Sequence, residues 1–234
     1  MKTVRSIVFV VSMTLFYTLG VGCQSNATVP FNGKDLNNWV VKGDPAASKW
    51  VVGKAELAAD DPKMLAAKPG SGEMINLPRQ HNDSLDIYTK EKFGDCHIEL
   101  ELMVPKDSNS GVYVMGEYEI QVLDSYGRET MGPGDMGAIY GAAPAPVNAC
   151  KKPGQWQKYV IDFQAPKFDA SGNKIANAKF IKVELNGQIL HKDLEMPAQT
   201  PGGVTEKENA AGPLMFQGNH GPVAYRNIRI APLK

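Results

Sequence analysis

The feature that most constrains the fold of this chain is an alternation of apolar and polar residues that recurs along most of its length. In the segment 96–104, every second residue from Cys96 onward is apolar, while His97, Glu99 and Glu101 are polar. Period-two alternation places the two sets of side chains on opposite faces of a β-strand. No stretch of twelve or more residues shows helical periodicity. Strands without crossover helices form antiparallel sheets, packed as a sandwich or closed as a barrel.

The same alternation predicts strands in several further segments. The pair Asn186-Gly187 separates two of them and is typical of a two-residue hairpin turn, because both residues tolerate positive φ. No internal repeat and no interdomain linker is visible after residue 30. We therefore expect one all-β domain, a sandwich of two antiparallel sheets. The further strands expected are 112–115, 118–122, 157–163, 180–185, 188–191, 213–217 and 223–230.

The N-terminus has the organisation of an export signal. Lys2 and Arg5 precede an apolar run over 7–21, which is shorter than the roughly 20 residues that a membrane-spanning helix needs. The residues before Cys23 also resemble a bacterial lipobox, in which Cys23 would carry lipid, although the leucine stands four rather than three positions before the cysteine. An ordinary signal peptide cleaved near the same point is the alternative.

From this organisation we expect a signal peptide over 1–22, a tether over 23–30 and the folded domain over 31–234. The protein is then exported, either to the periplasm of a bacterium or to a membrane through lipid on Cys23. Export also permits a disulfide between Cys96 and Cys150. The alternating strand around Cys96 favours a small buried hydrophobic residue there instead.

The charge balance excludes one broad class of partner. The chain has 25 Lys and Arg against 25 Asp and Glu, whereas nucleic-acid binders carry a basic excess that displaces phosphate counterions. The four histidines show no HxH or HExxH spacing, so we expect no histidine-built metal site and no cofactor. A calcium ion held by loop oxygens leaves little trace in a sequence, and that alternative stays open.

The segment 127–154 is too long for a simple connection. It holds six glycines and four prolines with little periodicity, yet it also contains Met136, Ile139 and Tyr140. Loops of this length inside a compact domain are usually functional or disordered. The apolar residues favour an ordered loop folded over the face of a sheet.

The densest polar cluster on an expected strand is 119–124. Period two places Glu119 and Gln121 on one face, and Asp124 joins them only if a bulge adds one residue. The spacing resembles the catalytic strand of laminarinase-like retaining glycosidases, with Gln121 at that family's Asp and Asp124 at its acid/base Glu. Double displacement needs two carboxylates about 5 Å apart. The amide and the shortened acid therefore disfavour that mechanism, and an exposed polar strand face is the plain alternative.

His220, between glycines in a predicted turn, is a second candidate for proton transfer near neutral pH. A histidine that only hydrogen-bonds its own loop is the alternative. Arg226 is an enolate or hydroxyl ligand, or else an exposed strand charge. Amides and aromatics are the side chains that bind sugar hydroxyls and ring faces. The candidates of this kind are Asn109, Tyr113, Gln121, Tyr140 and Gln217.

Several ordered blocks resemble the 3-keto-disaccharide hydrolase domain family, in the concanavalin-A-like lectin/glucanase superfamily. The opening block is FNGKDLNNW at 31–39, and the central ones are NSGVY at 109–113 and YEIQVLD at 118–124. The later blocks follow in the family's order over essentially the whole mature chain. They are GAIYG at 137–141, KPGQW at 152–156, GNHGPV at 218–223 and YRNIRI at 225–230.

The resemblance implies a jelly-roll β-sandwich, bacterial export and action on glycosides oxidised at C3 of the sugar. Such substrates are cleaved by removal of the C2 proton, elimination of the C1 aglycone and addition of water, which needs a base, an enolate stabiliser and an acid. We expect Glu119 or His220 as the base, with Asp124 supporting or protonating. The amides, tyrosines and Arg226 would orient the sugar or its enolate.

Two other functions stay open from the sequence. The same sandwich serves non-catalytic carbohydrate-binding modules, and Glu119 and His220 on opposite sides of the sandwich would favour that class. The third hypothesis is a laminarinase-like glucanase that acts on unoxidised polysaccharide. The partner we expect is a small oligosaccharide or glycoside. No dinucleotide fingerprint is present, so another protein would have to oxidise the sugar.

Overall fold

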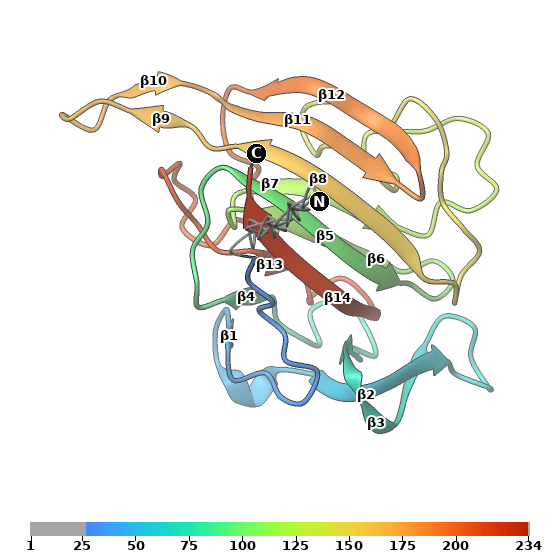
Figure 1. The fold of residues 1–234 in the computed structure, drawn as a ribbon. Helices are drawn as coiled ribbons and strands as arrows, with labels where there is room; N and C mark the ends of the chain where they lie inside the picture. The colour runs from blue at the N-terminus through green and yellow to red at the C-terminus, as the bar shows by residue number, and fades with distance from the viewer. Residues whose placement is uncertain (1–26, 234) are drawn as a thin grey trace, which may run out of the picture.

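Antiparallel pairing joins the strands of this chain into two large sheets that pack face to face (Figure 1). The computed structural model describes residues 27–233. One sheet has seven strands, in the order β12 (Gln188–Met196), β11 (Ala178–Leu185), β8 (Gln157–Gln164), β5 (Cys96–Met103), β14 (Val223–Pro232), β3 (Leu65–Asn76) and β2 (Trp50–Leu57). The other has five, in the order β1 (Trp39–Val41), β4 (Ile87–Thr89), β13 (Met215–Phe216), β6 (Asn109–Val114) and β7 (Tyr118–Leu123).

The predicted all-β jelly-roll sandwich is confirmed. The remaining regular elements are a short ribbon of β9 (Lys167–Phe168) and β10 (Lys174–Ala176), and the 3-10 helix η1 (Pro45–Ala47). The Asn186-Gly187 turn joins β11 to β12, with positive φ at both residues. Among the described residues, no helix is long and apolar enough to cross a membrane.

Aromatic side chains from both sheets meet in the core. The ring of Phe216 on β13 stacks on Tyr225 of β14, with centroids 3.7 Å apart and planes 5° apart. The Tyr225 hydroxyl lies 3.0 Å from the Ser110 hydroxyl, which donates to the Gln217 carbonyl at 2.7 Å. A stack and a hydrogen-bond chain therefore fix the five-stranded sheet to the seven-stranded one at its centre.

Three details differ from the sequence expectation or refine it. Thr28 pairs with Ile230 of β14 through two backbone hydrogen bonds of 2.7 and 2.9 Å, so the described part of the expected tether is packed on the domain. Cys96 and Cys150 are free thiols, with Cys96 buried, and no disulfide joins them. The predicted signal segment 1–22 and Cys23 lie outside the described residues.

The long segment 127–154 is ordered, but part of it lies along the edge of a sheet rather than over its face. Gly137 N donates to Gln121 O, and Gln121 N donates to Ala138 O, both at 2.9 Å. Tyr140 N continues the series to Glu119 O at 3.1 Å. The free edge of β7 is thereby covered, as exposed strand edges usually are.

Candidate functional site

The site is built on the outer face of the five-stranded sheet, where neighbouring strands place one residue each in a common row. Gly111 on β6 is opposite Gln121 on β7, and Gln217, directly after β13, donates its backbone N–H to Gly111 O at 2.9 Å. At the other side, Lys42 after β1 donates its backbone N–H to Asp86 O, before β4, at 2.8 Å. Residues directly opposite each other share a face. The register therefore converges five segments of the chain on one surface.

A missing side chain in this row makes room for the carboxyl group of Glu119. Glu119 is opposite Tyr113 in the next row of the β6–β7 pair. A Cβ added at Gly111 would lie 2.2 Å from Glu119 Oε1, closer than atoms can approach. Gly111 has no positive φ that would require glycine. Glycine at this position therefore leaves free the space that the Glu119 carboxyl group occupies.

A pocket of about 400 Å³ lies over these rows, within the usual range for a small-molecule site. Its walls come from three loops in addition to the sheet: the long segment contributes Tyr140, the turn after β13 contributes Asn219 and His220, and residues 197–212, which we name the strap, contribute Pro201 and Gly202. Seven of the nine predicted catalytic or binding residues line it. They are Asn109, Tyr113, Glu119, Gln121, Tyr140, Gln217 and His220.

Burial gives the Glu119 carboxyl group an unusual acidity. Its side chain is only 3% exposed, and burial raises its pKa from 4.5 to about 7. The Tyr113 hydroxyl lies within reach of both Glu119 and Pro201 O, 3.2 Å away, and its hydrogen opposes this rise in pKa when it is donated to Glu119, while the negative charge of Asp86 adds to the rise. Burial also holds the pKa of Tyr113 well above its usual value, so its hydroxyl stays a donor. At neutral pH, Glu119 is therefore poised between acid and base, as proton-transfer catalysts require.

Two amide oxygens in the same pocket lack partners. Asn109 Oδ1 and Gln121 Oε1 are buried, and neither accepts a hydrogen bond from any described residue. Buried acceptors are nearly always satisfied in folded proteins, and leaving one unsatisfied costs about 1–3 kcal/mol. The pair therefore marks positions where a ligand's hydroxyl groups would donate. Tyr140, 43% exposed at the rim, offers a ring face nearby.

His220 is held with one nitrogen engaged. Its Nδ1 lies 2.5 Å from Asn219 Oδ1, an acceptor, so Nδ1 carries the hydrogen and Nε2 is the atom that exchanges a proton. Burial lowers the pKa of His220, the neighbouring His81 lowers it further, and Asp86 opposes this. The His81 and His220 rings meet edge to face with centroids 4.6 Å apart.

The sequence and the fold of this chain are similar to those of known proteins. Residues 26–231 match the model of the 3-keto-alpha-glucoside-1,2-lyase-like domain. The chain belongs to this family. It is also similar to a protein classed as a glycosyl hydrolase from Parabacteroides distasonis, with 31% identity, a TM-score of 0.67, and coverage of 89% of this chain and 84% of that one.

Two further proteins of the same class and organism show the same fold. Their identities are 17% and 21%, each with a TM-score of 0.56, and this chain covers 94% and 98% of their lengths while they cover 89% and 88% of it. No curated protein matches the chain. Membership of the 3-keto-alpha-glucoside-1,2-lyase-like family makes this a carbohydrate-active protein of glycosyl hydrolase type.

Two charged residues of this family member's pocket were missed by sequence reasoning. Lys42 donates to Gly202 O of the strap at 2.8 Å and lies 3.8 Å from Asp86. Asp86 is 9% exposed and accepts a hydrogen bond from Gly218 N at 2.9 Å. Both residues flank three-residue strands, which are too short to show an alternation. Among the described residues that line the pocket, Lys42 is the single lysine or arginine.

The structure does not place Asp124 in the pocket. The pairing of β6 with β7 runs in regular register from Asn109 to Val114, so the bulge that would turn Asp124 toward Glu119 is absent from this described pair. Asp124 instead accepts hydrogen bonds from the backbone of Asp107 at 3.0 Å and Tyr126 at 3.2 Å. Its expected catalytic role is corrected to that of a turn cap.

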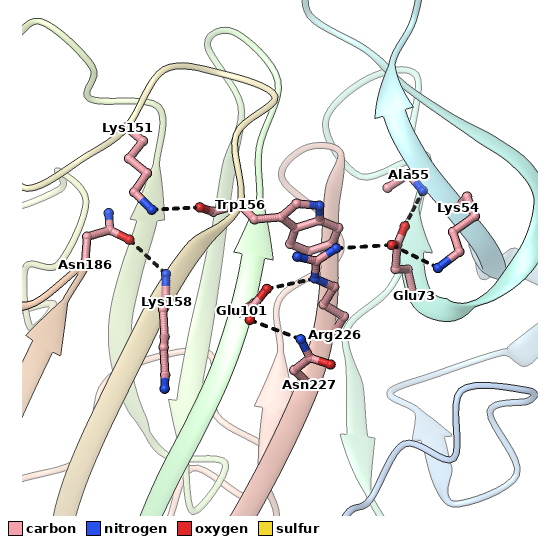
Figure 2. Close-up of polar contacts among 10 residues, drawn as sticks. All are labelled: Lys54, Ala55, Glu73, Glu101, Lys151, Trp156, Lys158, Asn186, Arg226 and Asn227. Atoms are coloured by element: carbon pink, nitrogen blue, oxygen red, sulfur yellow. Dashed lines mark hydrogen bonds and ion pairs between the residues drawn. The ribbon is translucent and has the colours of Figure 1, made fainter.

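Arg226 lies on the other sheet, as Figure 2 shows. Along β14 the side chain of Tyr225 faces the core, so that of Arg226 points outward. Its Nε donates to Glu101 at 2.8 Å, its Nη1 lies 3.4 Å from Glu73, and its guanidinium stacks 3.9 Å from the ring centroid of Trp156. These contacts occupy the guanidinium away from the pocket. The expectation that Arg226 binds the sugar or its enolate is therefore corrected.

A hollow of about 500 Å³ on the outer face of the seven-stranded sheet is a weaker candidate for the family's chemistry. Its ionisable groups pair with one another: His97 Nδ1 lies 2.5 Å from Asp162 and His97 Nε2 lies 3.4 Å from Glu99. No buried unpartnered polar atom lines it among the described residues. Within 27–233, no group of three or more His, Cys, Asp or Glu side chains is arranged to hold a metal ion.

Proposed function

We propose that this protein cleaves glycosides whose sugar carries a ketone at C3, by removing the C2 proton and expelling the C1 aglycone. The ketone makes the C2–H bond acidic, because the electron pair left on C2 delocalises onto the C3 oxygen. That pair then forms the C1–C2 double bond as the C1–O bond breaks, and the aglycone oxygen takes a proton. Water added across the double bond gives the free 3-keto sugar, so the net reaction is hydrolysis.

Three groups of the pocket meet the three needs of this route. Glu119 takes the C2 proton, because its raised pKa makes the ionised carboxylate a stronger base than an exposed one. The Lys42 ammonium, held by Gly202 O, stabilises the negative charge that develops on the C3 oxygen. His220 acts in its imidazolium form, in which Nε2 also carries a hydrogen: it gives that proton to the departing aglycone oxygen, and its lowered pKa favours the release. Lys42 thus takes the part that sequence reasoning assigned to Arg226.

The observation that carries the proposal is the pair of unpartnered amide oxygens beside a buried carboxyl group of raised pKa. Asn109 Oδ1 and Gln121 Oε1 would accept hydrogen bonds from sugar hydroxyls and fix the ring over Glu119. Tyr140 at the rim would pack against the ring. Orientation of this kind supplies much of the rate enhancement of proton-transfer enzymes.

A binding module and a conventional glycosidase remain the competing functions. A lectin-like module has no need of titratable groups converging on its sugar, yet Glu119 and His220 line one pocket. Asp86 does bring a second carboxylate beside Glu119, which favours the glycosidase more than the sequence did. One Asp86 oxygen accepts from Gly218 N and the other lies near Lys42, so neither is a free nucleophile.

The test is an NMR time course in deuterated buffer with a 3-keto glucoside and its unoxidised parent. Cleavage of the keto sugar alone, with deuterium at C2 of the sugar that is recovered, supports the elimination. Cleavage of the unoxidised parent would refute it in favour of a glycosidase. Line broadening without turnover of either compound would leave a binding module.

We also propose that the protein acts outside the bacterial cytoplasm. The support is the basic start and apolar run of 1–22, with Cys23 as the candidate for lipid attachment. Mass spectrometry of the membrane and periplasmic fractions tests this, since a lipidated Cys23 and a free cleaved N-terminus differ in mass.

A further inference from the structure

A hollow of about 300 Å³, which we name the second hollow, adjoins the pocket over Glu119 and Gln121, which we name the sugar pocket. It is formed by four turns that lie far apart in the sequence: 61–64 between β2 and β3, 78–81 after β3, 106–108 between β5 and β6, and 220–222 before β14. The turns are held together by backbone hydrogen bonds. Lys106 N donates to Pro62 O at 2.9 Å.

The two hollows meet at His220, which lines both. They also come close together at Ser108 and Asn109: Ser108 lines the second hollow, and the next residue, Asn109, lines the sugar pocket. The Ser108 hydroxyl donates to Pro222 O at 2.6 Å, which fixes this wall. His220 therefore forms the boundary between the two hollows.

The second hollow has more cations than carboxylates in its lining. Lys63 is paired with Asp107 at 2.9 Å, and the Asp61 carboxylate accepts the backbone N–H of Lys63 at 2.8 Å. Arg79 and Lys106 are exposed at its rim, and neither side chain forms a hydrogen bond or ion pair with any described residue. The lining thus has three cations, Lys63, Arg79 and Lys106, against two carboxylates, an excess of one positive charge. The His81 ring contacts the His220 ring beside them.

The sugar pocket has the opposite balance. Its lining holds the carboxyl groups of Asp86 and Glu119 against the single ammonium of Lys42. A negative group on a ligand is therefore repelled from the sugar pocket and attracted to the second hollow. The planar guanidinium of Arg79 suits a carboxylate, which it can hold with two parallel hydrogen bonds.

We propose that the second hollow is the aglycone subsite and that it takes an aglycone bearing a carboxylate. This inference rests on the proposed function. If His220 protonates the glycosidic oxygen, the sugar lies on one side of His220, in the sugar pocket, and the aglycone lies on the other, in the second hollow. A substrate of this chemistry is a 3-keto sugar joined to a uronic acid or to another acidic alcohol.

The experiment measures binding rather than turnover, so that its failure is separable from failure of the proposed function. The ¹⁵N-labelled protein is titrated with 4-carboxyphenyl glucoside and with its neutral isostere, 4-carbamoylphenyl glucoside, at low ionic strength. We expect the carboxylate ligand to bind about fivefold to tenfold more tightly, since each exposed ion pair contributes modestly and two can form. The amides of 61–64, 78–81 and 106–108 should shift, and added salt should reduce the preference.

Variants decide whether the two free cations are responsible. Combining Arg79→Gln with Lys106→Gln should make the two ligands bind equally, whereas Lys192→Gln, at an exposed position of β12, should leave the preference unchanged. Equal affinity of the two glucosides for the wild-type protein would overturn the inference. So would shifts produced as strongly by inorganic sulfate alone, because the hollow would then bind any anion independently of a glycoside.

Discussion

Replacing Glu119 by glutamine should stabilise the fold at neutral and alkaline pH while abolishing proton abstraction. The folded-state pKa of Glu119 is about 7, against 4.5 for a freely exposed carboxyl group. Below pH 4.5 the carboxyl group is protonated in both the folded and the unfolded chain. Between the two values the unfolded chain has lost the proton while the folded chain retains it, so stability falls as the pH rises.

The size of this loss follows from the shift. Each pKa unit is equivalent to about 1.4 kcal/mol, so the full difference is about 3 kcal/mol once the pH exceeds 7. The glutamine amide is uncharged at every pH and can still accept a hydrogen bond from Tyr113. Glu119→Gln should therefore unfold with the same free energy as the wild type at pH 4.5 and with about 3 kcal/mol more at pH 8. For a chain of this size, that is roughly 6–12 °C in Tm.

Urea unfolding at a series of pH values from 4.5 to 8 measures the difference. Glu129→Gln is the matched control, because Glu129 is exposed and its replacement should change the free energy of unfolding by less than about 0.5 kcal/mol at any pH. A Glu119→Gln protein no more stable than the wild type at pH 8 would refute the reasoning. Glu119 would then be ionised in the fold at no energetic cost, and its role as a poised base would lose its physical basis.

Three further substitutions test the other parts of the site on a 3-keto glucoside. Gly111→Ala should lower kcat/KM about 100-fold with the fold intact, because the new Cβ displaces the Glu119 carboxyl group by about 1 Å. The control is Gly134→Ala, because a Cβ at Gly134 meets no other atom. Equal activity of the two variants would contradict the packing argument. Lys42→Met should lower kcat about 100-fold or more with little change in KM, as loss of an oxyanion donor does; a change in KM alone would assign Lys42 to ground-state binding. His220→Gln should lose about 100-fold on a methyl glycoside but little on a 4-nitrophenyl glycoside, whose leaving group needs no proton, and equal losses on both would remove His220 as the acid.

The sequence predicts the long strands well because each shows enough alternation to define a face. The segment 96–104 became β5 and 223–230 became most of β14. The strands β2 and β3 were not predicted, since the middle of β3 contains Pro69, Gly70 and Gly72 and is exposed on both faces. Three-residue strands such as β1 and β4 are defined by their partners rather than by their own residues.

The candidate site was predicted where it depends on one strand and missed where it depends on which sheet a strand joins. Glu119 and Gln121 share a face because of period two, which a sequence shows directly. Arg226 also follows period two, but on the seven-stranded sheet, and nothing local distinguishes the two sheets. Asp86 and Lys42 reach the pocket only through pairing between segments more than 40 residues apart.

The stacking of Phe216 on Tyr225 and the hydroxyl chain through Ser110 have a consequence for how the site moves. Amide hydrogens of β6 and β13 at the floor of the pocket should exchange with solvent only when the whole domain unfolds, since nothing there opens without separating the two sheets. The strap is anchored on both sides of Pro201 and Gly202, by Thr200 N–H to Glu117 O and by Val204 N–H to Gly116 O, each at 2.8 Å. Movement at the rim is therefore confined to the short stretch between these anchors, on the nanosecond-to-microsecond timescale of loops, while Glu119 and the amides on the sheet stay fixed throughout each turnover.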